Sequence, residues 1–166
     1  MRIIKLGLIS AVFLFLAVTA ISLLLPSTIN ISRAIDVNAP LDSVYANINN
    51  LTKWKNWLAN YDSAKVSTSE NPVGKGATIT INKTIVTITA NNPDKIETLW
   101  LSGSKSLIGE FNFINHDNSS QVTVQWHFIQ HVRWYPWEKF ASIVSDKVMS
   151  PTMEKSLDNL KKLVEK

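Results

Sequence analysis

The sequence predicts an α+β fold, in which a curved antiparallel sheet wraps around a long C-terminal helix, preceded by one transmembrane helix. Three observations lead to this prediction. Residues 6–25 are uncharged and mostly apolar, the middle of the chain alternates apolar and polar residues between turns, and the last part repeats apolar residues at helical spacing. A helix laid across one face of such a sheet buries the apolar sides of both.

The uncharged stretch from Leu6 to Leu25 is about 20 residues long, which is enough for a helix to cross the hydrocarbon core of a bilayer. Pro26 follows where that helix would end. Arg2 and Lys5 precede the stretch, so the positive-inside rule places the N-terminus in the cytoplasm and the rest of the chain outside it. We therefore expect a single-pass anchor at residues 1–27 and one domain at residues 28–166.

Two other interpretations of this segment stay open. Val18-Thr19-Ala20 is a possible cleavage site of a signal peptide, but residues 21–25 continue the apolar run beyond it. The apolar part of a signal peptide is usually about 7–15 residues long, which favours a retained anchor. A buried core helix is the other interpretation, although the segment has no periodic polar face.

The predicted domain opens with a strand and two short helices. Apolar and polar residues alternate from Ile31 to Val37, which indicates a strand. Pro40 suits the first turn of a helix, which residues 44–51 continue at helical spacing. Thr52 is expected to cap a second short helix that runs through residues 54–57.

A series of strands follows. Asn71-Pro72 and Gly74-Lys75-Gly76 are turn signals, and later turns are predicted at residues 91–94, 102–104 and 116–119. Such short links favour antiparallel hairpins over parallel crossovers. The predicted strands are a short edge strand at Val66, then Ala77–Asn82, Thr84–Ala90, Lys95–Leu101, Leu107–Asn115 and Gln121–Val132.

The chain ends in a long amphipathic helix. Its apolar positions recur with a period near 3.6 from Phe140 to Val164. Pro151 interrupts this pattern, so we expect it either to kink the helix or to restart it with Ser150 as the cap. A cleft remains between this helix and the sheet wherever the facing side chains do not fill it.

Composition excludes several classes of function. The formal net charge of +4 includes Arg2 and Lys5, which leaves too little positive charge on the domain to suggest nucleic-acid binding. The chain has no cysteine, so disulfides and thiolate metal sites are excluded. His127 and His131 lie on one predicted strand, about 13 Å apart, and are not expected to share a metal ion. We expect neither a metal nor another cofactor, and the sequence predicts no oligomeric state.

Five segments of the domain stand in a characteristic order. They are Ile31–Pro40, Leu51–Trp57 with its two tryptophans, Val73–Ala77 with its glycine turn, Gln121–Trp126 and Leu157–Leu163. Together they resemble the START-like (SRPBCC) superfamily of polyketide cyclases, dehydrases and lipid-transport proteins. The resemblance implies a helix-grip fold with a cavity for an apolar or amphipathic ligand, but no single activity. Thr78, Thr80 and Asn82 are polar where family members often have an aromatic strand.

The resemblance and the six tryptophans suggest where a ligand would bind. The superfamily places the tryptophans of the second helix, Trp54 and Trp57, at the cavity mouth, although buried aromatic residues also simply fill cores. Residues 134–137 form an aromatic cluster that either touches the bilayer interface or packs as a turn. Arg33 and Arg133 can each hold an anionic head group or lie in solvent. The cavity candidates are Trp54, Trp57, Tyr61, Trp100, Trp126, Phe128, Val144 and Val148.

Three functions compete. The leading hypothesis is a membrane-anchored, non-catalytic protein that binds a hydrophobic small molecule or lipid. The second is a cyclase-type or hydrolase-type enzyme, which needs a titratable group in the cavity. The third is a structural or interaction module without a ligand, which a cavity below roughly 300 Å³ would favour. Candidate catalytic groups for the second hypothesis are Tyr45, Tyr61, Glu97 and His127.

Overall fold

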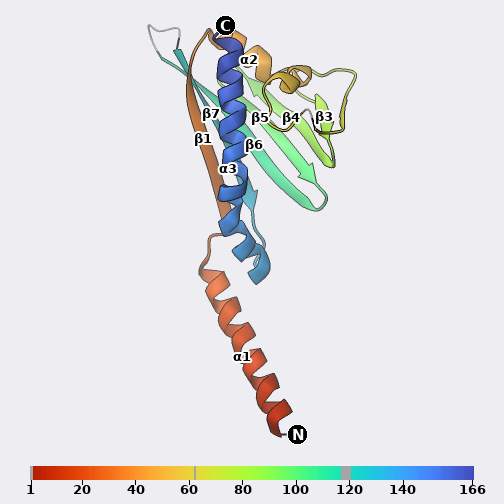
Figure 1. The fold of residues 1–166 in the computed structure, drawn as a ribbon, viewed down its shortest axis with the longest axis vertical. Coiled ribbons are helices and arrows are strands. Elements are labelled where there is room, and N and C mark those ends of the chain that lie inside the picture. The colour runs from red at the N-terminus through yellow and green to blue at the C-terminus, as the bar shows by residue number, and fades with distance from the viewer. Residues whose placement is uncertain (1, 62, 117–120) are drawn as a thin grey trace.

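The computed structural model of the chain describes residues 2–61, 63–116 and 121–166. The N-terminal helix stands apart from a single α+β body (Figure 1). The elements are α1 (Arg2–Leu24), β1 (Thr28–Asn38), α2 (Leu41–Ile48), the 3-10 helix η1 (Leu51–Asn56), β2 (Val66–Thr68), β3 (Thr78–Ile81), β4 (Thr84–Asn92), β5 (Lys95–Ser102), β6 (Lys105–Asn115), β7 (Gln121–His131) and α3 (Pro136–Val164).

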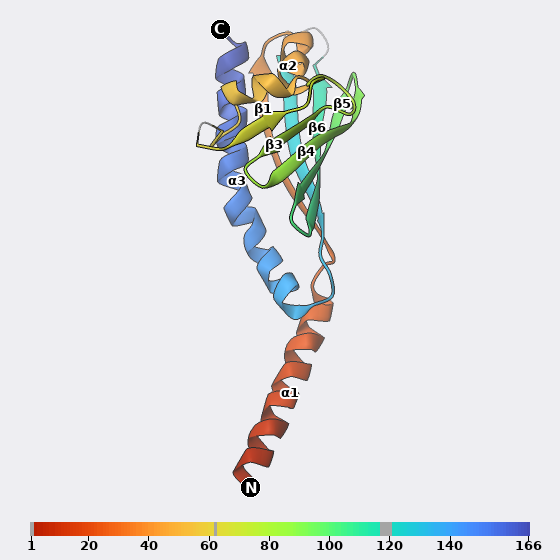
Figure 2. The same cartoon turned by 90° about the vertical axis from the view of Figure 1, so that its right-hand side faces the viewer.

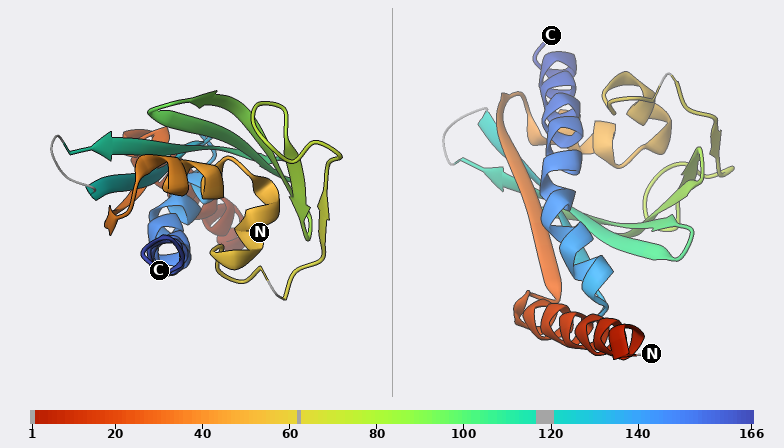
Figure 3. Two further views of the ribbon diagram at one scale, coloured as in Figure 1. Left: turned by 90° about the horizontal axis from the view of Figure 1, so that it is seen from above. Right: turned by 60° about the horizontal axis from the view of Figure 1, so that its bottom comes forward.

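The strands form one antiparallel sheet of seven strands in the order β1-β7-β6-β5-β4-β3-β2. Consecutive strands from β2 to β7 pair as neighbours, whereas β1 crosses over to pair with β7 along its whole length. The sheet curves, and α3 lies on its concave side (Figure 3). A register shift in β4 between Ile88 and Ala90 adds to the local twist. The predicted fold class, a curved antiparallel sheet on a long C-terminal helix, is confirmed.

Alternation along β7 shows how the sheet divides its residues between two faces. Val122, Val124, Trp126 and Phe128 are buried on the side of α3, while the residues between them lie on the opposite, more polar face. The inner face meets the buried residues of α3, chiefly Met153, Leu157 and Leu160, while α2 and η1 close one end of the body (Figure 2). The core therefore lies between the sheet and the last helix.

Helix α1 projects away from the domain, and Ser22 is its only buried residue. In the described part of the chain it is the one helix long and apolar enough to cross a membrane, with a mean hydropathy of 2.5. A core helix would have its apolar side chains covered, whereas those of α1 are exposed. The interpretation of this segment as a buried core helix is therefore wrong. A membrane anchor and a signal peptide remain as the two interpretations of α1.

Local predictions at two caps need correction. Asn50, not Thr52, caps η1: its side-chain oxygen accepts hydrogen bonds from the backbone N–H and the hydroxyl of Thr52, at 3.0 and 2.7 Å. Asparagine suits this position because its short side chain reaches the free N–H groups of the first turn. Ser150 does not restart α3, which runs through Pro151 without a break, and its hydroxyl instead donates to Asp146.

Several element boundaries also differ from the prediction. Strand β1 begins at Thr28 and β6 begins at Lys105, three and two residues before the predicted starts at Ile31 and Leu107, and α3 begins at Pro136, one turn before the apolar repeat that starts at Phe140. Pairing with neighbouring strands extends β1 and β6 into polar sequence, because backbone hydrogen bonds do not depend on side-chain polarity. Most of the turn predicted at residues 116–119 falls on residues 117–119, which lie outside the described residues.

Candidate functional site: a cavity between the sheet and α3

A cavity of about 730 Å³ lies between the inner face of the sheet and the middle of α3. This volume falls within the range of roughly 300–1,000 Å³ that is usual for small-molecule sites. Its apolar lining comes from Leu58, Ala59, Ile81, Trp100, Leu107, Trp126, Phe128, Val148, Met149 and Met153, and its polar lining from Asn60, Asn82, Lys83, Thr84, Ser102, Lys105, Gln130, Ser145 and Thr152.

The course of α3 explains why this space is not filled. The C-terminal half of the helix lies on the sheet and buries Leu157 and Leu160 completely or almost completely. The N-terminal half extends past the tips of the β3–β4 and β5–β6 hairpins toward α1 (Figure 2). Val148, at the edge of the cavity, is accordingly 68% exposed.

Four of the eight predicted cavity residues line this space: Trp100, Trp126, Phe128 and Val148. Trp126 and Phe128 point inward because they alternate with Gln125 and His127 along β7. Their rings lie 5.2 Å apart, and the ring of Trp100 is 5.2 Å from that of Phe128. The sheet side of the cavity is therefore an aromatic wall.

The other four predicted residues lie elsewhere. Trp54 and Trp57 are fully buried behind the wall, with ring centroids 5.7 Å from Trp100 and 6.2 Å from Trp126, respectively. Their indole N–H groups donate to backbone carbonyls of α2, at Ile48 and Asn47. In this structure they support the lining instead of contributing to it.

Tyr61 lines a smaller neighbouring pocket of about 310 Å³ near η1, and burial raises the pKa of its phenol. Val144 is half-exposed on α3 and is not among the residues that line the cavity. Neither position lines the large cavity.

The two tryptophans of the aromatic wall differ in the hydrogen bonding of their indole N–H groups. The indole N–H of Trp100 donates to the hydroxyl of Thr98 at 2.9 Å, and that hydroxyl donates to the carbonyl of Gly109 at 2.9 Å. The indole nitrogen of Trp126 is buried and has no hydrogen-bond partner among the described residues. A buried donor without an acceptor costs about 1–3 kcal/mol, which the packing of the Trp126 ring has to offset.

Gly109 makes this wall possible. A Cβ at this position would lie 2.7 Å from the hydroxyl of Thr98, 2.8 Å from the ring of Phe128 and 2.9 Å from the indole nitrogen of Trp100. Only a residue without a side chain lets both aromatic rings approach the strand so closely. The sequence pattern identified neither Thr98 nor Gly109, because both are small and interrupt an otherwise apolar series.

Two lysines stand at the open end of the cavity. Lys83 lies in the turn between β3 and β4, and Lys105 opens β6 after the turn at Gly103. Both are exposed, and the described lining contains no carboxylate. The cavity is thus apolar inside and carries positive charge at its rim. Sequence patterning could not have identified these lysines, because a charged residue in a turn is ordinarily a solvent-exposed one.

None of the four candidate catalytic residues lines the large cavity. His127 is on the outer face of the sheet, where its Nε2 lies 2.9 Å from Glu110. Glu97 is on the same face and its hydrogen bond raises the pKa of Lys95. The ring of Tyr45 packs 5.6 Å from Phe113. Among the described residues, no group of three or more His, Asp or Glu side chains could hold a metal ion.

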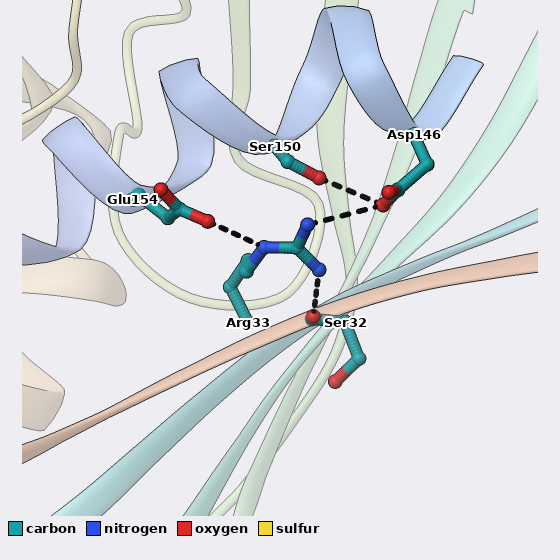
Figure 4. Close-up of polar contacts among 5 residues, drawn as sticks. All are labelled: Ser32, Arg33, Asp146, Ser150 and Glu154. Carbon is teal, nitrogen blue, oxygen red and sulfur yellow. Dashed lines mark hydrogen bonds and ion pairs between the residues drawn. The ribbon is translucent and has the colours of Figure 1, made fainter. Parts of the chain in front are cut away.

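Arg33 joins β1 to α3 (Figure 4). It is not among the residues that line the cavity. Its guanidinium lies 2.7 Å from Glu154 and 3.2 Å from Asp146, and it donates to the carbonyl of Ser32 at 2.6 Å. The two carboxylates lie about two helical turns apart on α3 and flank Ser150 and Pro151. Arg133, 4.0 Å from Glu138, is also outside the lining. Neither arginine is in place to hold a head group in the cavity.

The fold and the cavity define a protein of the helix-grip class, with a ligand-sized space between sheet and helix. The chain belongs to the family described as polyketide cyclase / dehydrase and lipid transport, whose sequence profile matches residues 28–165. A comparison with curated proteins finds no match. The superfamily that the sequence suggested is therefore confirmed.

Solved structures show the same fold at low sequence identity. A protein of Nitrosospira multiformis has a TM-score of 0.64 at 16% identity, with 82% of this chain and 96% of that chain covered. Norcoclaurine synthase of Thalictrum flavum, solved in complex with a transition-state analogue, has a TM-score of 0.65 at 14% identity, with coverages of 82% and 94%. The di-domain aromatase/cyclase StfQ of the steffimycin biosynthetic pathway has a TM-score of 0.65 at 13% identity, covering 83% of this chain and 51% of StfQ.

Proposed function

We propose that the protein is a membrane-anchored binder of a hydrophobic or lipid-like small molecule, which occupies the cavity between the sheet and α3. The observation that carries this proposal is the cavity itself: about 730 Å³, with apolar walls on both the sheet and the helix. Burial of a ligand's apolar surface there contributes about 25 cal/mol per Å². A space of this size and character suits a ligand of the lipid or polycyclic kind.

The polar groups suggest how such a ligand is oriented. Its apolar part would lie against Trp100, Trp126 and Phe128, and its polar end would face Lys83 and Lys105 at the rim. We therefore expect an amphiphile with an anionic or strongly polar end.

The apolar N-terminal helix and the charges around it support attachment of the protein to a membrane. In this proposal residues 1–27 form the anchor and residues 28–166 the ligand-binding domain. Arg2 and Lys5 precede α1, whereas Arg33 is the first basic residue after it. The positive-inside rule counts charges within about 15–20 residues of a span and so favours a cytoplasmic N-terminus and an extracytoplasmic domain.

Intact mass spectrometry of the protein isolated from membranes tests the anchor. A retained helix leaves the full 18.6 kDa chain in the membrane fraction after carbonate extraction. Loss of the residues up to Ala20 and release into the soluble fraction would instead identify a signal peptide.

Native mass spectrometry and a fluorescent fatty acid, cis-parinaric acid, test ligand binding. Ser145 lines the cavity, whereas Ser106 is exposed and lies outside the lining. Ser145→Trp fills the cavity and is expected to weaken binding of the probe by at least tenfold. Ser106→Trp adds the same side chain and should leave the affinity within twofold. Absence of binding in the unmodified protein, or equal affinities in all three proteins, would contradict the proposal.

A further inference from the structure

An exposed aromatic segment lies between β7 and α3. Trp134 and Trp137 are 56% and 63% exposed, and the ring of Tyr135 lies between them, 4.7 Å from the first and 4.9 Å from the second. Exposed tryptophan pairs of this kind are unusual on a soluble surface and typical of membrane–water interfaces, where the amphipathic rings of Trp and Tyr concentrate.

This segment is held at the end of α1. Lys139, in the first turns of α3, is almost fully buried and donates to the carbonyl of Leu25 at 2.9 Å and to the hydroxyl of Ser27 at 2.8 Å. Leu25 directly follows α1. The ammonium group of Lys139 therefore binds at the C-terminal end of α1, where the last backbone carbonyls lack helical partners and the helix dipole is negative. If α1 crosses a bilayer, Lys139 places the aromatic segment at the level where the chain leaves it.

An exposed apolar stripe continues from this segment along α3. Trp137, Phe140, Val144 and Val148 follow at spacings of three and four residues and therefore lie on one side of the helix. Phe140, Val144 and Val148 are 41%, 51% and 68% exposed. Val148 also lines the cavity. The stripe, about 16 Å long, thus runs from the end of the anchor to the cavity mouth.

We propose that Trp134 and Trp137 lie in the interface of the bilayer that α1 crosses, and that the stripe carries a lipid chain from this leaflet into the cavity. The inference rests on the proposed function and specifies its source of ligand. Loading along the stripe keeps the apolar part of the lipid in contact with apolar side chains during transfer. Passage through water would instead expose that surface at a cost of about 0.8 kcal/mol per CH₂ group.

Quenching of tryptophan fluorescence tests the placement of the aromatic segment. The full chain is reconstituted into phosphatidylcholine vesicles whose acyl chains carry bromine atoms close to the head group. The emission lost on bromination is compared between the unmodified protein and the double variant W134F/W137F, which keeps aromatic rings at both positions. We expect the loss to fall in the double variant. An equal loss in both proteins would contradict the interfacial placement.

Transfer kinetics test the stripe. Val144→Asp places a charge in the middle of the stripe, and Val73→Asp makes the same change at a valine of similar exposure, 44%, near η1. We expect Val144→Asp to slow transfer of cis-parinaric acid from phosphatidylcholine vesicles at least fivefold. The affinity of Val144→Asp for cis-parinaric acid added from ethanol should stay within twofold of that of the unmodified protein. Val73→Asp should change neither the transfer rate nor the affinity.

The outcomes separate the two proposals. Normal transfer by Val144→Asp, or equal slowing by both variants, would overturn the stripe and leave ligand binding intact. A protein that takes up the probe by neither route would overturn ligand binding and the stripe together.

Discussion

The two halves of α3 carry similar apolar side chains and use them in opposite ways. In the C-terminal half, Met153, Leu157 and Leu160 are at most 2% exposed, whereas Phe140, Val144 and Val148 in the N-terminal half are 41–68% exposed. Both sets repeat at helical spacing, so amphipathicity alone does not distinguish them. The difference arises because the apolar inner face of the sheet covers the C-terminal half, whereas the N-terminal half extends past the β3–β4 and β5–β6 hairpins and meets β1 through the Arg33–Asp146 ion pair, which leaves the cavity at the junction.

The largest expected effect on stability comes from shortening a buried side chain in the C-terminal half of α3. Leu160→Ala removes a fully buried side chain and should lower the free energy of unfolding by about 2–5 kcal/mol. Val144→Ala removes an exposed side chain and should change it by at most about 0.5 kcal/mol. Urea unfolding of the full chain in detergent measures both. Similar losses at the two positions would show that the N-terminal half is also packed.

Gly109→Ala sharpens the comparison by testing the sheet side of the cavity. The added methyl group would meet Thr98, Phe128 and Trp100 at less than 3 Å, so the aromatic wall has to move. We expect a loss of about 1–3 kcal/mol in the free energy of unfolding. Gly7→Ala, where a Cβ meets nothing within 4 Å, is the control and should cause no loss. A neutral Gly109→Ala would mean that the wall is loosely packed.

Arg33→Met tests the junction between the halves, where Arg33 binds Asp146 and Glu154. These carboxylates are 54% and 62% exposed, so solvent weakens the ion pairs and the expected loss is about 1 kcal/mol. The loss should shrink in 1 M salt, where the Debye length is about 3 Å. Arg133→Met removes a longer ion pair, with Glu138, whose arginine is more exposed, and should lower the free energy of unfolding by less than Arg33→Met does. A salt-independent loss would indicate a packing role for Arg33 instead.

The smallest effect is expected at the rim beside the uncovered half. Replacing Lys83 and Lys105 together by alanine should weaken binding of cis-parinaric acid about threefold, which corresponds to about 0.6 kcal/mol. Binding of its uncharged methyl ester should not change. The double variant K65A/K75A removes two exposed lysines that do not line the cavity. Equal effects on acid and ester would show that the lysines do not recognise charge.

Local patterns were sufficient for much of the fold. Alternation along β7 identified the inward positions of Trp126 and Phe128, and the helical period identified the long last helix. The cap of η1 was predicted incorrectly, because the side chain of Asn50 accepts both the N–H and the hydroxyl of Thr52 and so starts the helix earlier. Of the two alternatives at Pro151, the restart with Ser150 as the cap is wrong, because the hydroxyl of Ser150 donates to Asp146 within a continuous helix. Such choices depend on partners that a periodic pattern does not specify.

By itself, the sequence determined the apolar helix at the N-terminus, the order of strands and helices, and the face of the sheet on which most side chains lie. These properties follow from residues that are neighbours along the chain. The tertiary structure alone decided that Trp54 and Trp57 support the cavity wall while Trp100 and Trp126 line it. It also decided that Lys139 binds the end of α1, that Arg33 joins β1 to α3, and that Lys83 and Lys105 line one rim. Periodicity gives the direction of a side chain, but what that side chain meets depends on the curvature of the sheet and the length of the helix opposite.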